Sequence, residues 1–245
     1  MGSLHKGHVS LIKKSLKKCK KTLVSIFVNP TQFNNKNDYK KYPKNLKKDL
    51  FILRKLNVDF LYIPKKKHIY DTRRKIKVKL DKYDKVLCAK YRKGHFEGVI
   101  DVMDRLTNKI KPKKIFMGEK DFQQLHLVKK YIRSRYKSQI ISCKTIRDSN
   151  KLALSSRNIL LSKKELSIAG KLAQNIITYK KKLAKKNKLE IDLNSKKNEL
   201  VEKFKIFIEY FELRNIFNLR SSNDIGKSKL FIAYYINNIR LIDNF

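Results

Sequence analysis

The chain has 245 residues, with 61 lysines and arginines against 21 aspartates and glutamates, which gives a formal net charge of +40. Hydrophobic residues make up 41% of it, enough to build a core and too many for a wholly disordered chain. The sequence has no apolar run approaching the ~18 residues of a membrane span, and its first residues lack the basic start and apolar middle that predict a secretory leader. Its three cysteines share no CxxC spacing, which excludes a zinc ribbon and a disulfide framework. We therefore expect a folded, cytoplasmic protein.

The basic residues are spread through nearly every segment of the chain and form no single stripe. Such a spread is typical of a solvated surface, whereas a nucleic-acid site needs clustered charge. A basic RNA- or DNA-binding protein stays an alternative interpretation. Non-specific, salt-dependent binding to nucleic acid is expected in either case.

The first half of the chain alternates between helical and strand patterns. Apolar residues at helical spacing predict helices over 9–20, 46–56, 99–110 and 123–135. Short apolar runs predict strands over 23–28, 58–63, 114–117 and 139–143. This alternation predicts an α/β fold with a Rossmann-like, doubly wound parallel sheet.

The pattern changes after about residue 146. A loop to residue 161 is followed by a long amphipathic helix over 163–186 and a second helix from residue 195. Short strands are predicted over 208–214, 230–236 and 240–242. We therefore predict two domains, a Rossmann-like domain over 1–146 that binds the ligands and a smaller C-terminal α+β lid domain over 147–245.

Glycine and histidine are scarce, and most of them fall in three short segments, MGSLHKGH, RKGHFEGV and GEKDFQQL. In the first segment His5 and His8 flank Gly7 just before the first predicted helix. A helix N-terminus offers free N–H groups and a partial positive charge to phosphate, and imidazoles can donate protons or hydrogen bonds to developing charge. The segment therefore fits a nucleoside triphosphate. Two surface histidines at the start of a helix are the other interpretation.

Other polar residues lie where ligands commonly bind. Gln32 follows the strand that Pro30 ends, at a carboxyl edge where open α/β sheets bind ligands. Lys120 lies at a second helix start, and the segment LALSSRN places hydroxyls and Arg157 in the loop between the predicted domains. Each segment alone also fits an ordinary surface loop, so only their conjunction is specific.

Taken in order, several motifs resemble those of the pantoate–β-alanine ligase family of HIGH-type nucleotidyltransferases: MGSLHKGH, FVNPTQF, the Tyr-Pro at 42–43, RKGHFEGV, GEKDFQQL, LSSRN and the terminal RLIDN. The resemblance covers essentially the whole chain. It implies that pantoate attacks the α-phosphate of ATP to give pantoyl adenylate and pyrophosphate, and that β-alanine then displaces AMP. It also implies that ATP is a co-substrate, that Mg²⁺ accompanies the nucleotide, and that the protein is a homodimer. The lack of a long apolar run separately predicts no membrane association.

The resemblance further implies roles for individual residues. His8 would be the proton donor, with His5 and Lys120 as its catalytic partners. Gln32 and Gln124 would bind pantoate, Gln32 would also seat β-alanine, and Asp49 is the candidate metal ligand. The implied ATP-binding residues are Met1, Gly2, Ser3, Leu4, His5, Lys6, Gly7, His8, Gly118, Glu119, Lys120, Asp121, Ile146, Leu154, Ser155, Ser156 and Arg157.

The sequence departs from the family pattern in three places. Family members carry a stretch before the HxGH segment that includes the first strand of the sheet, and because everything downstream is intact we expect the native start to lie upstream of Met1. Lys48-Asp49 stands where two adjacent acids are common, and residues 148–151 lack the usual Pro and Gly. Another HxGH nucleotidyltransferase and an inactive remnant are further alternatives.

Overall fold

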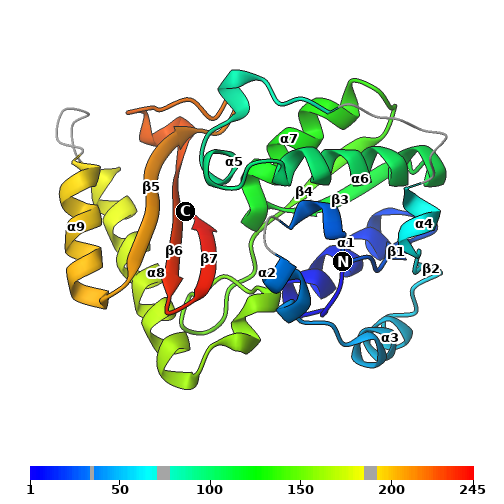
Figure 1. The fold of residues 1–245 in the computed structure, drawn as a ribbon, viewed down its shortest axis with the longest axis horizontal. Helices are drawn as coiled ribbons and strands as arrows, with labels where there is room; N and C mark the ends of the chain where they lie inside the picture. Colours follow the sequence, from blue (N-terminus) through cyan, green and yellow to red (C-terminus); the bar gives the residue numbers. More distant parts are fainter. Residues whose placement is uncertain (34–35, 71–77, 185–191) are drawn as a thin grey trace. The chain divides into compact units, whose positions relative to one another are not determined.

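The computed structural model describes residues 1–33, 36–70, 78–184 and 192–245 (Figure 1). They form two compact units. The first consists of Met1–Lys85 and Ala89–Thr145, and the second of Val86–Cys88 and Ile146–Phe245. The sequence pattern does not predict that Val86–Cys88 belongs with the C-terminal half. The binding and lid roles expected for the two parts stay predictions.

The first unit alternates helices with short strands. Its helices are α1 (Lys6–Lys18), α2 (Lys36–Lys41), α3 (Leu46–Lys55), α4 (Lys66–Ile69), α6 (His95–Ile110) and α7 (Phe122–Arg133), while α5 (Cys88–Tyr91) begins at the junction of the units. Its strands are β1 (Leu23–Ser25), β2 (Phe60–Tyr62), β3 (Lys114–Gly118) and β4 (Gln139–Cys143). The predicted helices and strands of this half are therefore present, with ends shifted by a few residues, whereas α2, α4 and α5 were not predicted.

The strands of the first unit form two parallel pairs. In one pair Leu23 of β1 lies opposite Phe60 of β2, and in the other Lys114 of β3 lies opposite Gln139 of β4. Each pair is a separate two-stranded sheet. Met1 lies beside the end of β1 and bonds to it as a residue of a parallel strand would, because its amine donates to the Ser25 carbonyl and its carbonyl accepts from the Phe27 N–H.

Apolar contacts join α1 and α3 to strand β1 and the residues next to it. Leu4, Ile12, Val24, Ile26 and Leu53 form one buried cluster. The α3 helix begins after Asn45, whose side chain accepts the N–H of Lys48, as expected of an N-terminal cap. This packing fixes the segment that precedes α1 against the strands.

The second unit contains a three-stranded antiparallel sheet, in the order β5 (Phe207–Asn215), β6 (Ser228–Ile236) and β7 (Ile239–Asn244). Helices α8 (Lys163–Leu183) and α9 (Leu193–Phe204) lie side by side along this sheet in Figure 1. Ser162 and Glu165 cap the start of α8 reciprocally. The predicted end of this helix at residue 186 lies outside the described residues. No helix in the described ranges is both long and apolar enough to span a membrane.

Candidate active site

The HxGH segment lies at the N-terminus of α1, as the sequence predicts. His5 is the capping residue, and its Nδ1 accepts the backbone N–H of Gly7 at 3.1 Å. A neutral His5 therefore carries its proton on Nε2. The rings of His5 and His8 have centroids 4.1 Å apart, and His8 Nδ1 is buried without a hydrogen-bond partner in the described part of the chain. Buried polar atoms of this kind are rare and often mark functional sites.

Both histidines are neutral at physiological pH. Burial, reinforced by the positive charge of Lys120, lowers the pKa of His5 to about 4. Burial, followed by the charge of His5, lowers the pKa of His8 to about 3. Because the charges of Lys120 and Asp121 act on both rings, the structure brings the first and third predicted segments together. Neutral imidazoles can donate hydrogen bonds, and Lys120 places a positive charge near both rings.

These pKa shifts predict a stability that falls in mild acid. The unfolded chain protonates His8 below about pH 6.5, whereas the folded chain does not until about pH 3, so the unfolded state binds more protons between these values. Between pH 7 and pH 5, wild type should therefore lose roughly 1–2 kcal/mol more of its free energy of unfolding than His8→Asn does, because the variant lacks the imidazole. Urea unfolding of both proteins at the two pH values measures it. A pH-independent difference would contradict the buried, neutral His8.

The GEKDFQQL segment follows strand β3. Gly118 ends the strand, and a Cβ added there would meet no atom within 4 Å, so this position faces open space. Lys120 Nζ lies 3.5 Å from Asp121 Oδ1. The two glutamines that follow differ, because Gln123 is buried and donates to the Asp84 carbonyl at 3.2 Å, whereas Gln124 is only half-buried. Gln124, the glutamine predicted to bind substrate, is therefore more accessible than Gln123.

The RKGHFEGV segment holds the loop that carries Gln32. His95 Nδ1 lies 2.6 Å from the Gln32 carbonyl, and Arg92 donates to His95 Nε2 at 3.0 Å. A carbonyl only accepts and a guanidinium only donates, so His95 is the neutral tautomer with its proton on Nδ1. A Cβ on Gly98 would lie 2.6 Å from the Thr31 carbonyl oxygen, which only glycine permits. The RKGHFEGV motif stands out in the sequence, but its contacts with the backbone at Gln32 appear only in the fold.

Asp49 does not fit the role of metal ligand that the sequence implied for it. Its side chain is buried, and its Oδ2 and Oδ1 accept the backbone N–H groups of Ser3 and Leu4 at 2.9 and 2.6 Å. Mg²⁺ prefers an octahedral site that keeps several waters, which a buried carboxylate with both oxygens engaged does not offer. Among the described residues, no group of three or more histidine, cysteine or acidic side chains is placed to hold a metal.

The remaining predicted ATP-binding residues belong to the second unit. Leu154 donates its N–H to the Ile146 carbonyl at 2.9 Å, which closes a hairpin-like loop between them. Ser155 caps the 3₁₀ helix η4 (Ser156–Leu160) by accepting the N–H of Arg157 at 3.2 Å. Ser156 is buried and Arg157 is half-buried. This loop is thus ordered by its own hydrogen bonds.

An ion pair that the sequence does not predict supports this loop. Arg147 binds Asp243 through two hydrogen bonds of 2.7 and 2.9 Å, and it also donates to the carbonyls of Lys151 and Asn244. Asp243 is the acidic residue of the terminal RLIDN motif and is 6% exposed. The only sequence feature that pointed to Asp243 was its place in the RLIDN motif, one of the motifs that this chain shares with the family.

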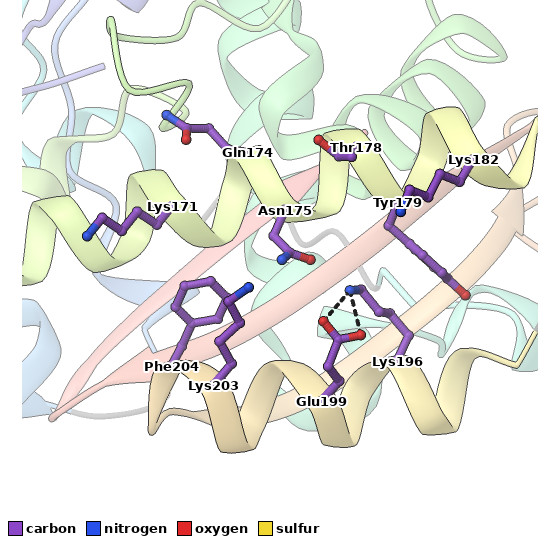
Figure 2. Close-up of a pocket in the computed structure, with 10 residues that line it drawn as sticks. All are labelled: Lys171, Gln174, Asn175, Thr178, Tyr179, Lys182, Lys196, Glu199, Lys203 and Phe204. Carbon is purple, nitrogen blue, oxygen red and sulfur yellow. Dashed lines mark hydrogen bonds and ion pairs between the residues drawn. The ribbon is translucent and has the colours of Figure 1, made fainter.

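A pocket of about 550 Å³ lies between α8 and α9, and Figure 2 shows side chains of the two helices facing each other across it. Among the described residues that line it, the acidic one is Glu199, which pairs with Lys196 at 2.7 Å. The described lining includes none of the predicted site residues. The pocket belongs to the second unit alone.

Known proteins are similar to this chain over its full length. A family model described as Pantoate-beta-alanine ligase matches residues 1–245. A pantothenate synthetase of Francisella philomiragia subsp. philomiragia is 38% identical, over 100% of this chain and 86% of its own length.

Solved structures agree with the sequence matches. A pantothenate synthetase of Thermus thermophilus has a TM-score of 0.92 at 28% identity, covering 100% of this chain and 90% of that one. A pantoate–β-alanine ligase of Francisella tularensis, complexed with beta-gamma ATP and beta-alanine, has a TM-score of 0.82 at 37% identity, covering 100% and 86%. These matches confirm the predicted α/β fold class and the resemblance seen in the sequence. This chain belongs to the pantoate–β-alanine ligase family.

Proposed function

We propose that the residues of this chain carry out the ligation typical of its family, joining pantoate to β-alanine through a pantoyl-adenylate intermediate. The observation that carries the proposal is the His5 and His8 pair at the N-terminus of α1, with ring centroids 4.1 Å apart and both rings within the field of Lys120. Neutral donors, a cation and a helix N-terminus together suit a polyphosphate that gains charge during reaction.

In the first step a pantoate carboxylate oxygen bonds to the α-phosphorus of ATP, and the bond from that phosphorus to the bridging oxygen of pyrophosphate breaks. We assign His8, His5 and Lys120 to the phosphates. The remaining ATP contacts are assigned to the other residues of Met1–His8, to Gly118–Asp121, to Ile146 and to Leu154–Arg157. No protein nucleophile is needed, because alignment of two bound reactants and stabilisation of the charged transition state supply the rate.

In the second step the amine of β-alanine bonds to the acyl carbon of the adenylate and loses a proton, while the bond from that carbon to the bridging oxygen breaks and AMP leaves with that oxygen and the bonding electron pair. Gln32 and Gln124 are assigned to pantoate, with Gln32 also contacting β-alanine. The hydrogen bond from His95 to the Gln32 carbonyl supports the first of these assignments, because it fixes the backbone at Gln32.

The metal enters this proposal as part of the nucleotide. Mg²⁺ binds readily to substrate phosphates and keeps several of its waters, so ATP is proposed to arrive as its magnesium complex. Asp49 is not assigned to the ion. The family resemblance also supports a homodimer acting in the cytoplasm, which light scattering and cell fractionation test directly.

The test is AMP release with each substrate omitted in turn, combined with exchange of labelled pyrophosphate into ATP. The proposal expects exchange that needs pantoate but not β-alanine, and AMP turnover that needs both. Exchange without pantoate would favour another HxGH nucleotidyltransferase. Absence of both reactions in a folded protein that still binds RNA at about 0.15 M salt would favour the basic nucleic-acid-binding alternative.

A further inference from the structure

We propose that Asp49 is a positioning residue for ATP, which holds the backbone of the HxGH segment in its binding conformation and coordinates no metal. The proposal rests on the proposed role of Met1–His8 in nucleotide binding. It concerns a residue of α3 that lies 45 positions from the nearer of the two amides that it binds.

The carboxylate of Asp49 grips two successive peptide groups. Its Oδ2 accepts from Ser3 at 2.9 Å and its Oδ1 from Leu4 at 2.6 Å, and the side chain is 1% exposed. Hydrogen bonds to a charged acceptor are shorter and stronger than neutral ones, and removal from water strengthens them further. Both oxygens thus have a directed backbone partner immediately before His5.

The backbone at this point needs such a support. Ser3 has φ +50°, in the left-handed region that residues with a Cβ seldom adopt. Conformations of this kind persist only where the surroundings hold them, and they cluster at ligand sites. The two bonds to Asp49 fix the peptide groups on both sides of the Ser3 Cα atom, so they select this conformation.

Helix α3 also holds Leu4, the residue after Ser3, through apolar packing. Leu4 is buried in a cluster with Leu53, which lies one turn after Asp49 on α3. His5 follows directly and caps α1. Asp49 and Leu53 together therefore set the direction from which the chain enters α1, and with it the places of the first free N–H groups and of the two imidazoles.

The decisive variant is Asp49→Asn, which keeps the shape of the side chain but turns an NH₂ group toward one of the two amides. We expect the Kd for ATP, measured by calorimetry without pantoate or β-alanine, to rise about tenfold. The KM for β-alanine should stay unchanged. Asp59→Asn is the matched control, because Asp59 also accepts a backbone N–H, that of Thr22 at 2.9 Å, elsewhere in the same unit. The control should bind ATP as wild type does.

A structural or metal role predicts other results. If both variants lower the melting temperature and neither changes the Kd for ATP, Asp49 is merely structural and the proposal fails. If excess Mg²⁺ restores ATP binding to Asp49→Asn, Asp49 is a metal ligand and the proposal also fails. Should Asp49→Asn not fold, Asp49→Glu retains the charge but displaces the oxygens, and ATP affinity equal to wild type in that variant would overturn the proposal.

The proposed function and the proposed role of Asp49 are tested by different measurements. ATP binding is measured without the other substrates, so an enzyme that adenylates a different acid would still depend on Asp49. A wild-type protein without pantoate-dependent pyrophosphate exchange would remove the proposed function alone.

Discussion

His8→Asn is expected to lower the kcat of pantoate-dependent AMP release by about 10²–10³-fold, the usual effect of removing one donor aimed at developing charge. The ring of His8 is mostly buried, its pKa is lowered to about 3, and its Nδ1 has no hydrogen-bond partner among the residues described. A neutral donor in a desolvated place acts strongly on a transition state whose charge is growing. Single-turnover formation of AMP isolates the chemical step from product release.

The matched control for this variant is His68→Asn. His68 is an exposed histidine of α4 in the same unit, and its Nδ1 accepts the Lys65 N–H at 3.3 Å. We expect full activity from it. A His8→Asn enzyme that is folded and retains the wild-type kcat would show that the imidazole contributes nothing to the reacting phosphates.

Asp243→Asn is expected to destabilise the second unit by roughly 3 kcal/mol, because it leaves the guanidinium of Arg147 beside a neutral side chain. Asp243 is buried and accepts both hydrogen bonds of the Arg147 fork, at 2.7 and 2.9 Å. Removing one partner of such a pair leaves the other charge poorly solvated. For a chain of this size the loss corresponds to a fall in melting temperature of about 6–12 °C, measurable by calorimetry.

Glu199→Gln provides the comparison for Asp243→Asn. Glu199 pairs with Lys196 on α9 in the same unit, but the Glu199 side chain is 52% exposed. Exposed pairs contribute only about 0–1 kcal/mol, so the melting temperature should hardly change. Equal losses in the two variants would mean that burial does not set the strength of the Arg147 pair.

Local pattern predicted those elements whose apolar residues repeat over two turns or more. The α7 helix came out nearly as predicted because its apolar residues Leu125, Val128 and Ile132 repeat at helical spacing and are buried. The β4 strand, Gln139–Cys143, has the predicted bounds. The α4 and α5 helices have four residues each, too few to show a helical period. Short helices are set by the contacts around them, which local sequence does not contain.

The sequence predicted which residues belong to the candidate site, but it did not predict the distant residues that hold them in place. His5, His8 and Lys120 could be predicted because they lie at helix starts next to glycines, and both features are visible in the local sequence. The contacts of Asp49 with Ser3, of His95 with Gln32 and of Arg147 with Asp243 join residues 46, 63 and 96 positions apart. Without the fold, nothing in the sequence links these partners. The lowered pKa values of the histidines follow from burial and were equally invisible.

The three residues Val86–Cys88 have a consequence for the order in which this protein matures. They belong to the second unit, where Cys88 Sγ lies 3.1 Å from the Tyr210 hydroxyl and 3.4 Å from a nitrogen of Arg240. Tyr210 and Arg240 are synthesised more than 100 residues after Cys88, so Val86–Cys88 cannot form these contacts until most of the second unit has been made. A fragment starting at Ile146 would lack Cys88 and the fully buried Leu87. We therefore expect such a fragment to be less stable than the second unit of the whole chain, because three residues of that unit would be missing.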